Sequence, residues 1–446
     1  MEKQREKLSS RLGFLLLSAG CAIGLGNVWT FPWRTGNNGG GAFVFVYVLA
    51  LIFLGLPVMT AEFTIGRAGR KSPILMYQQL EKPGQKWHIH GWLSLAGNTF
   101  LMMFYTTIAG YFFYYLIRFI GGSTENLTYA ATAANPWVNV GFMVLVVVLG
   151  FFVLSFNLQG GVEKVTKYMM VALFLLMIIL AIRSCTLAGV REGLSFYLKP
   201  DFSKITGSVI VAAMNQAFFS LSLGMGSMAI FASYIDREHS LMGESLNVVG
   251  LDTLVALLAG FIIFPACFTY DIPVDAGPPL LFTTMVSVFN NMAGGRIWGA
   301  MFFLFMIFAA MSTVFAVLEN ILAMVRDLTG WDRKKACPIL AAIIIVLCLP
   351  MAFTGNILAN VQPFHDGDGF LGLWSFFVEK IIQPLGSLFY LLFVTRRFGW
   401  GWDSFVEEAN AGKGFKVRGW MKIFFKYITP AIIAAIMIYG LVTYPY

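Results

Sequence analysis

Residues 18–33 read SAGCAIGLGNVWTFPW, and they lie in a segment that is otherwise apolar enough to cross a membrane. Gly20, Gly24 and Gly26 favour unwinding of a helix, and Pro32 removes a backbone donor. In hydrocarbon such a break is tolerated only where the freed backbone groups face protein, water or a bound ion. A membrane helix broken near the bilayer midplane is typical of a transporter binding site. This stretch therefore predicts where the functional site lies.

The composition is that of a membrane protein. The 446 residues are 58% hydrophobic and only 12% charged, whereas a soluble protein needs far more charge at its surface. Apolar runs of about 20 residues predict membrane-spanning helices. Eleven such runs occur, at approximately 11–35, 42–69, 89–120, 137–156, 163–186, 206–236, 243–271, 294–327, 336–354, 367–395 and 419–443. We therefore expect an all-α, multi-pass membrane protein.

The basic residues predict the orientation of the chain and explain its net charge of +8 without a nucleic-acid partner. They gather in alternate connections, whereas connections 121–136 and 355–368 contain no Lys or Arg. By the positive-inside rule, the N-terminus is cytoplasmic and, after an odd number of spans, the C-terminus is outside. The connection 187–205 departs from this pattern, because it carries three basic residues on the predicted outer side. The expected location is the cell membrane.

A second interrupted helix is predicted in the sixth span. The sequence SLSLGMGSM at 220–228 places serines and glycines in the middle of this span. Two breaks five spans apart suggest an inverted pair of five-helix repeats, comprising spans 1–5 and 6–10, with span eleven added. The repeats would cover about 11–186 and 206–395, and the additional helix about 419–443, within one transmembrane domain of residues 1–446. We also expect an interfacial helix within 70–88 and an outer cap within 272–293.

Several motifs resemble those of the neurotransmitter:sodium symporter family, in particular its bacterial amino-acid transporters. The motifs follow one another along the whole chain: GLGNVWTFPW (24–33), NNGGGAF (37–43), GLPVMTAEFTIGR (55–67), QAFFSLSLGMG (216–226), FAAMSTVFAVLENI (308–321) and KYITP (426–430). The resemblance implies two inverted five-helix repeats with broken spans 1 and 6. It also implies sodium-coupled uptake of amino acids or amines.

The resemblance implies two sodium ions and no organic cofactor. The residues of the first sodium site would be Ala22 through its carbonyl, Asn27, Ser220 and Asp252, together with the carboxylate of the substrate. The second would use the carbonyls of Gly20, Ile23 and Ala309 and the hydroxyls of Ser312 and Thr313. Taken alone, the last two hydroxyls could simply bond back to their own helix.

Asp252 departs from the family pattern, because many relatives carry Asn there and recruit a chloride ion nearby. A carboxylate within a membrane span is costly and is a functional candidate by default. We hypothesise that Asp252 supplies fixed negative charge and makes chloride unnecessary. Tyr47, Gln216 and Ser220 match three positions of the chloride site, whereas Ala256 stands where other relatives hold Ser or Glu. The alternative, a structural acid paired with a cation, lacks a Lys or Arg in that span.

The substrate site is also implied by the resemblance. The substrate carboxylate would meet the first sodium ion, the amides near Leu25 and Gly26, and the Tyr105 hydroxyl. Its amino group would face carbonyls of the broken sixth span around Phe219 and Ser222. The side-chain pocket would consist of Leu101, Phe219, Met225, Ala316 and Val317. Although Leu101, Ala316 and Val317 could individually serve only in packing, the set predicts a neutral hydrophobic amino acid, aliphatic or aromatic.

The resemblance assigns supporting and gating roles as well. Glu62 would hydrogen-bond the unwound part of span six. The inner gate would pair Arg5 with Asp327, and Tyr234 and Ser233 would support it.

The outer gate departs from the family, because Thr30 and Ser375 replace its Arg and Asp. The loss of both members is self-consistent, since the loss of one would strand a charge. We expect closure by the bulk of Phe219 and Trp33, with Arg34 as a substitute charge. Val171 replaces a proline that many relatives use to unwind span five.

The sequence favours a secondary transporter that imports its substrate by alternating access. A sodium-conducting channel or an amino-acid sensor on the same scaffold is the first alternative. A membrane enzyme is the second, but the sequence shows no Ser/His/Asp constellation or metal-ligand cluster, so we expect no enzyme activity. The expected partners are a small neutral amino acid and the lipid bilayer, and the oligomeric state is left open.

Overall fold

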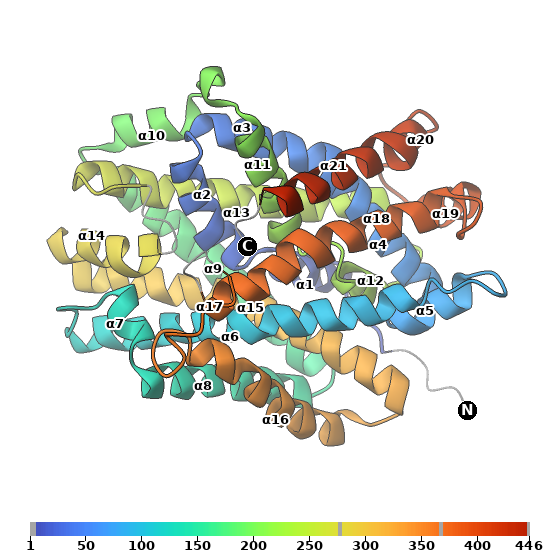
Figure 1. Ribbon diagram of the computed structural model, residues 1–446, viewed down its shortest axis with the longest axis horizontal. Helices are drawn as coiled ribbons and strands as arrows, with labels where there is room; N and C mark the ends of the chain where they lie inside the picture. The colour runs from blue at the N-terminus through green and yellow to red at the C-terminus, as the bar shows by residue number, and fades with distance from the viewer. Residues whose placement is uncertain (1–5, 275–278, 365–368, 444–446) are drawn as a thin grey trace.

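The computed structural model describes residues 6–274, 279–364 and 369–443. Within these ranges the secondary structure is helical apart from one isolated bridge between His239 and Lys413. Long helices lie side by side and run across the molecule in Figure 1. The fold is therefore the all-α bundle that the apolar runs predict.

Nine helices in the described ranges are long and apolar enough to cross a membrane. They are Gly41–Gly69 (α3, η2, α4), Ile89–Gly121 (α6), Pro136–Ser155 (α8), Gln159–Ser184 (η3, α9), Leu241–Thr269 (α13), Gly295–Thr329 (α15), Arg333–Ala352 (α16), Gly369–Thr395 (α17, η6, α18) and Met421–Val442 (α20, η7, α21). The remaining two predicted spans are broken. The first consists of α1 (Arg11–Ala22) and Gly26–Asn37 (η1, α2), and the sixth of α11 (Gly207–Ser220) and α12 (Ser227–Ala232).

Short helices cover both ends of the bundle. One end carries the start of α1, α5 (Pro73–Leu80) and α19 (Trp402–Ala409), and we call it the N-terminal end. The opposite end carries α7 (Tyr129–Ala133), α10 (Val190–Leu198) and η5–α14 (Leu280–Asn291), as Figure 1 shows. The helix expected within 70–88 and the structured cap within 272–293 are present, with 275–278 outside the described residues. The sequence analysis did not predict α7, α10 or α19.

The broken first span lies inside the bundle. Helix α1 packs against α15, α13 and α9, and α15 in turn packs against α6. In the most apolar window of α15, 83% of the residues are buried, compared with 28% in the Gln159–Ser184 span. Helix α15 is therefore central and the fifth span peripheral. The freed backbone of the first span faces protein, which is the condition for a break at membrane depth.

The fifth span is irregular at its start and regular at Val171. A π-helical turn covers Gln159–Glu163, and α9 (Lys164–Ser184) continues without interruption through Val171. Without proline, every residue of this stretch keeps its backbone donor. Glu163 in the π-helical turn accepts hydrogen bonds from the backbone N (2.9 Å) and hydroxyl (2.5 Å) of Ser9. The irregular start of this span is thus tied to the segment preceding α1.

Candidate functional site

The break in the first span leaves backbone groups available at the centre of the molecule. Helix α1 ends at Ala22, and the chain bends by 49° before Gly26–Asn37. The amide of Leu25 donates a hydrogen bond to the hydroxyl of Tyr105 (3.0 Å). A Cβ atom on Gly24 would lie 2.2 Å from Thr313 Oγ1 and 2.4 Å from Tyr105 Oη. Glycine is thus required for this close approach of the backbone to two hydroxyl groups.

The break in the sixth span is wider and contains three residues with positive φ. Between α11 and α12, φ is 52° at Ser222, 81° at Gly224 and 75° at Gly226. Glu62, a fully buried residue of α4, accepts a hydrogen bond from the Gly224 amide at 2.5 Å. The hydroxyl of Ser222 donates to the Cys21 carbonyl (3.1 Å), which links the two breaks directly. The broken segments therefore form one continuous polar centre.

Four of the residues predicted for the first sodium site belong to this centre. The amide nitrogen of Asn27 donates to Oδ1 of Asp252 (2.8 Å) and to its carbonyl (3.0 Å). The hydroxyl of Ser220 lies 3.3 Å from Oδ2 of Asp252 and 3.0 Å from the hydroxyl of Tyr47. The side chains of Asn27, Ser220 and Asp252, and that of Tyr47 beside them, are fully buried. Ala22 is the last residue of α1, directly before the break.

Asp252 lacks a cationic partner in the described ranges, in which its carboxylate contacts only neutral groups. Burial of a charge is costly unless it is paired or coordinated to a cation. Asn27 Nδ2, Ser220 Oγ and Tyr47 Oη supply hydrogen bonds, but none of them neutralises a charge. The site is therefore electrostatically suited to a small cation.

The residues predicted for the second sodium site converge on the other side of the first break. Ser312 donates to the carbonyls of Ala309 (2.9 Å) and Ile23 (3.4 Å). Thr313 lies 3.2 Å from the carbonyl of Gly20 and 3.5 Å from that of Ile23. Backbone carbonyls and hydroxyls of α1 and α15 thus form a compact set of oxygens, and hard cations such as sodium prefer oxygen ligands.

A small central cavity separates the two breaks. Six of the residues predicted for the substrate site line it: Leu25, Gly26, Leu101, Tyr105, Phe219 and Ser222. Cys21, Ala22, Gly24, Thr313 and Gln383 complete its lining. Its free volume is about 10 Å³, roughly the space of a single water molecule. The site is closed in this conformation, and an amino acid would require its walls to move.

Three residues predicted for the pocket, Met225, Ala316 and Val317, are fully buried but do not line the cavity. The side chain of Met225 instead lies against Gly97 of α6, where an added Cβ would be 3.2 Å from Met225 Cγ. Gln383 lines the cavity although the sequence analysis missed it. Its Oε1 atom is buried and has no hydrogen-bond partner in the described ranges, so it offers an acceptor at the cavity wall.

Phe219, which lines the cavity, belongs to a cluster that we call the outer closure: Arg34, Glu379, Gln216, Trp33 and Phe219. Arg34 forms an ion pair with Glu379 (2.6 Å) and donates to Gln216 Oε1 (2.9 Å). Its guanidinium lies over the rings of Trp33 (5.3 Å) and Phe219 (6.0 Å). A charged pair therefore closes the cavity together with the aromatic rings.

The sequence analysis expected the bulk of Phe219 and Trp33 here, with Arg34 as a substitute charge, and the structure adds Glu379 as the partner of Arg34. Thr30 donates to the Gly26 carbonyl (2.9 Å), and Ser375 donates to the Gly372 carbonyl (3.1 Å). The pair formed by Arg34 and Glu379 stands four residues beyond each of them, and four residues are about one helical turn.

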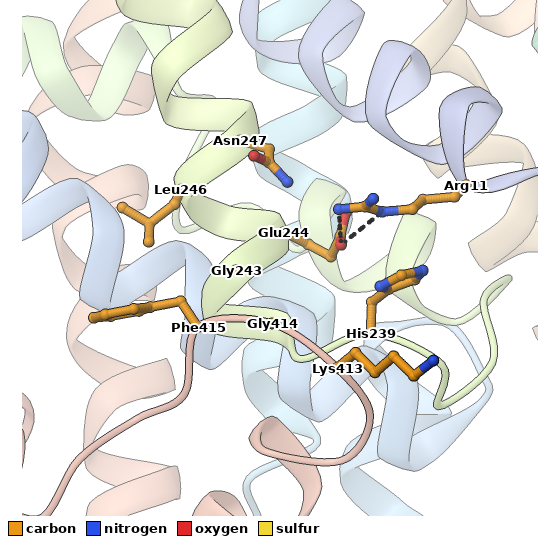
Figure 2. A pocket seen from close by; sticks show the side chains of 9 residues that line it. All are labelled: Arg11, His239, Gly243, Glu244, Leu246, Asn247, Lys413, Gly414 and Phe415. Atoms are coloured by element: carbon orange, nitrogen blue, oxygen red, sulfur yellow. Dashed lines mark hydrogen bonds and ion pairs between the residues drawn. The ribbon is translucent and has the colours of Figure 1, made fainter.

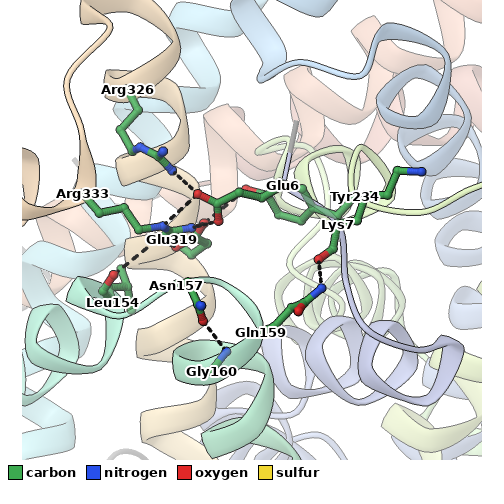
Figure 3. Close-up of polar contacts among 10 residues, drawn as sticks. All are labelled: Glu6, Lys7, Leu154, Asn157, Gln159, Gly160, Tyr234, Glu319, Arg326 and Arg333. Atoms are coloured by element: carbon green, nitrogen blue, oxygen red, sulfur yellow. Dashed lines mark hydrogen bonds and ion pairs between the residues drawn. The ribbon is translucent and has the colours of Figure 1, made fainter. Parts of the chain in front are cut away.

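A second, partly buried cluster lies toward the N-terminal end, and we call it the inner closure: Glu6, Tyr234, Glu319, Arg326 and Arg333. Figure 3 shows Glu6 between the two arginines. Arg333 binds both oxygens of Glu319 (2.6 and 2.7 Å) and Oε2 of Glu6 (2.9 Å). Arg326 pairs with Glu6 (3.0 Å), and the hydroxyl of Tyr234 donates to Glu319 (3.2 Å).

The inner gate predicted from the sequence is described only in part, because Arg5 lies outside the described residues. Asp327 accepts a hydrogen bond from the backbone N of Ser72 (2.7 Å). Tyr234 joins the inner closure, and its carbonyl accepts a hydrogen bond from the amide of Leu8 (3.3 Å). The sequence analysis missed Glu6, Glu319 and Arg333. For Glu319 a signal was present in the sequence, because a Glu within an apolar span is a functional candidate by default.

Comparisons with known proteins identify the family. The family model described as the sodium:neurotransmitter symporter family matches residues 5–141 and 138–446. The chain is 33% identical to the sodium-dependent transporter YhdH of Bacillus subtilis, over 93% of both chains. It is 32% identical to a sodium-dependent transporter of Haemophilus influenzae, over 98% of this chain and 99% of that protein.

Two further relatives extend the comparison. The sodium-dependent serotonin transporter of Drosophila melanogaster is 28% identical, over 99% of this chain and 77% of that protein. Among solved structures, MhsT in complex with L-phenylalanine matches with a TM-score of 0.89 and 32% identity, over 98% of this chain and all of the MhsT chain. These matches confirm the family and the multi-pass membrane fold. The family consists of transporters and not of enzymes, as the sequence analysis expected. The chain therefore belongs to the sodium:neurotransmitter symporter family and is a sodium-dependent membrane transporter.

Proposed function

We propose that this transporter imports neutral hydrophobic amino acids together with sodium by alternating access. The central cavity carries this proposal, because its walls combine the backbone of two broken helices with Leu101 and Phe219. The Leu25 amide and the Tyr105 hydroxyl suit a carboxylate, and uncharged walls suit an apolar side chain. The similarity to MhsT, whose structure contains L-phenylalanine, supports the same substrate class.

Two oxygen clusters support a stoichiometry of two sodium ions. The first, around Asn27 and Asp252, lies beside the cavity, so that a substrate carboxylate could complete it. The second, around Ser312 and Thr313, is built from α1, α15 and Ile23 at the start of the break. A shared ligand at the first site would make substrate and sodium stabilise each other's binding. Two sodium ions entering a cell at −100 mV would supply roughly 4.6 kcal/mol.

We further propose that transport is independent of chloride. The fully buried carboxylate of Asp252 meets only neutral donors in the described ranges. Its fixed charge would balance a bound sodium ion and remove the need for an anion at this place. Ala256, which lies one turn further along α13, offers no polar group to hold one.

The proposed orientation places the N-terminus in the cytoplasm and the C-terminus outside. Arg34 and Glu379 would then close the extracellular side, and the inner closure would close the cytoplasmic side. Labelling of single cysteines introduced near each terminus of a cysteine-free chain tests this arrangement in intact cells. Reaction of the N-terminal cysteine with an impermeant reagent would contradict it.

The deciding experiment is uptake of radiolabelled amino acids into proteoliposomes that contain the full chain. We expect accumulation of leucine, phenylalanine or tryptophan only with an inward sodium gradient. Binding without accumulation would identify a sensor, and sodium current without substrate coupling would identify a channel.

The role of Asp252 is tested in the same assay by replacement of chloride with gluconate. We expect wild-type uptake to stay unchanged and the Asp252→Asn variant to lose sodium-driven uptake or to require chloride. Loss of most wild-type uptake in gluconate would refute chloride independence. Thr253→Val is a matched control, since among the described residues the Thr253 hydroxyl bonds only back to the Val249 carbonyl (2.7 Å) of the same helix.

A further inference from the structure

A second cavity, of about 360 Å³, lies at the N-terminal end and away from the central site. Its walls come from the first turn of α1, the start of α13 and the connection 410–418 that follows α19. Figure 2 shows the nine residues that line it. Its volume falls within the range of small-molecule sites, about 300–1,000 Å³.

The buried carboxylate of Glu244 points to a ligand with a hydrogen-bond donor. The Glu244 side chain is only 2% exposed, and both of its bonds to Arg11 (2.9 and 3.0 Å) use the same oxygen, Oε1. Its other oxygen, Oε2, is buried and has no partner in the part of the chain that the structure describes. An unpartnered buried carboxylate oxygen is costly. A primary ammonium group would satisfy it.

The cations around Glu244 point to an anionic group on the same ligand. Arg11 keeps its guanidinium about half exposed, and Lys413 is exposed in the facing connection. Lys413 forms no ion pair among the described residues, and the ring of His239 lines the same wall. Two full cations and one carboxylate thus line the same cavity, and Arg and Lys together favour a phosphate group.

The remaining wall points to a lipid rather than a free metabolite. Figure 2 shows Leu246 and Phe415 on one side of Glu244, and Arg11, His239 and Lys413 on the other. Leu246 is 41% exposed and Phe415 43% exposed. In a membrane protein, exposed apolar side chains beside a basic pocket are typical of contacts with a lipid headgroup and its acyl chains.

We propose that this cavity binds the headgroup of an aminophospholipid. The phosphate would lie between Arg11 and Lys413, and the primary ammonium would donate to Oε2 of Glu244. The acyl chains would leave along Leu246 and Phe415. Because the lipid would bridge α1, α13 and the connection 410–418, its binding would favour conformations in which these elements stay together.

The test measures which lipid the purified full chain retains. The protein is mixed with equal amounts of phosphatidylethanolamine, phosphatidylcholine and phosphatidylglycerol, and bound lipid is counted by native mass spectrometry. We expect phosphatidylethanolamine to exceed phosphatidylcholine about fivefold, since trimethylation removes the donors that Glu244 would accept. Glu244→Gln should abolish this preference, and Lys413→Gln should weaken binding of phosphatidylethanolamine and phosphatidylglycerol alike.

Lys334→Gln is the matched control, because Lys334 is an exposed lysine near the start of α16, outside the cavity. Equal retention of the three lipids by the wild type would overturn the proposal. Retention that Lys413→Gln leaves unchanged would also overturn it, and this exposed residue makes the test independent of any folding defect in Glu244→Gln. A titration with soluble O-phosphoethanolamine separates the sources, since binding as tight as that of the lipid would indicate a free phosphate ester.

Discussion

The outer closure and the inner closure differ in the number of ion pairs that they contain. In the outer closure, one ion pair between Arg34 and Glu379 lies over the rings of Trp33 and Phe219. In the inner closure, two carboxylates and two guanidinium groups join the N-terminal segment to α15 and α16. Further toward the surface, Asp236 binds both Lys7 and Arg70. The outer side thus contains one ion pair, whereas the inner side contains a network of ion pairs.

This difference suggests how the present conformation would open. Separation of a single pair costs less than separation of several coupled pairs, and buried charges that lose one partner are strongly destabilising. We therefore expect the outer side to open more readily than the inner side in the absence of substrate. Loss of a residue of the inner closure should therefore lower the stability of the whole molecule. Loss of a residue of the outer closure should mainly change the release of substrate from the site.

The largest effect is expected from Arg333→Met, which leaves the fully buried Glu319 without its bidentate partner. We expect a loss of about 3–5 kcal/mol of stability, measured by thermal unfolding in detergent. The double variant Arg333→Met/Glu319→Met should recover most of this loss, because no unpaired charge remains. Lys335→Gln, an exposed neighbour, serves as the control. A single variant as stable as the wild type would contradict the network.

A smaller and local effect is expected from Arg34→Gln. Hydrogen bonds to charged groups contribute about 1.5–3 kcal/mol, so the dissociation of the proposed substrate phenylalanine should accelerate about tenfold or more. Glu379→Gln should behave similarly, and combining the two should cost less than the sum. Release rates measured with radiolabelled substrate check this. Unchanged release in both variants would show that the pair does not close the site.

The inner closure should also weaken at acidic pH through Glu6. Burial raises the pKa of Glu6, but hydrogen bonds and charge interactions with Arg333 and Arg326 outweigh it and hold the pKa below its ordinary value. The resulting stabilisation is present above the pKa of the unfolded chain, about 4.3, and is lost as the pH falls through the lower folded value. The difference in melting temperature between wild type and Glu6→Gln should therefore narrow on acidification. A constant difference would contradict this assignment.

The smallest effect is expected from Lys7→Gln at the surface of the inner side. Lys7 and Asp236 are both about half exposed, and Asp236 keeps its contact with Arg70 (3.1 Å). Exposed ion pairs contribute about 0.2–1 kcal/mol and are screened by salt. Thermal unfolding at low and high salt should show a difference that shrinks with salt. If Lys7→Gln lost as much stability as Arg333→Met, the surface ion pairs and not the buried ones would contribute most to the stability of the inner side.

Much of the fold could be predicted because its signals are local. A membrane span needs about 20 consecutive apolar residues, and the predicted run 137–156 corresponds to the observed helix Pro136–Ser155. The two breaks were predicted from glycines and polar residues inside apolar runs. The short helices α10 and α19 were missed, because each lies in a connection whose helical pattern is too short to stand out.

The missed parts of the site are contacts between distant segments. Arg34 was considered as a substitute charge, but its partner Glu379 lies 345 positions further along the chain. Glu6 meets Arg333 across 327 positions. Gln383 faces the cavity only because span ten packs beside the sixth break, where a Cβ atom on Gly224 would lie 2.2 Å from its carbonyl.

The sequence alone determined the number of spans, the two places where they break and the family, because apolar length, glycine and proline act on neighbouring residues. Only the tertiary structure decided which side chains close the cavity and how small it is in this conformation. It also decided that Met225, Ala316 and Val317 are buried but absent from the lining of the cavity. The physical reason is that burial, ion pairing and cavity size depend on helix packing. A periodic apolar pattern does not specify which distant residue pairs with each buried charge.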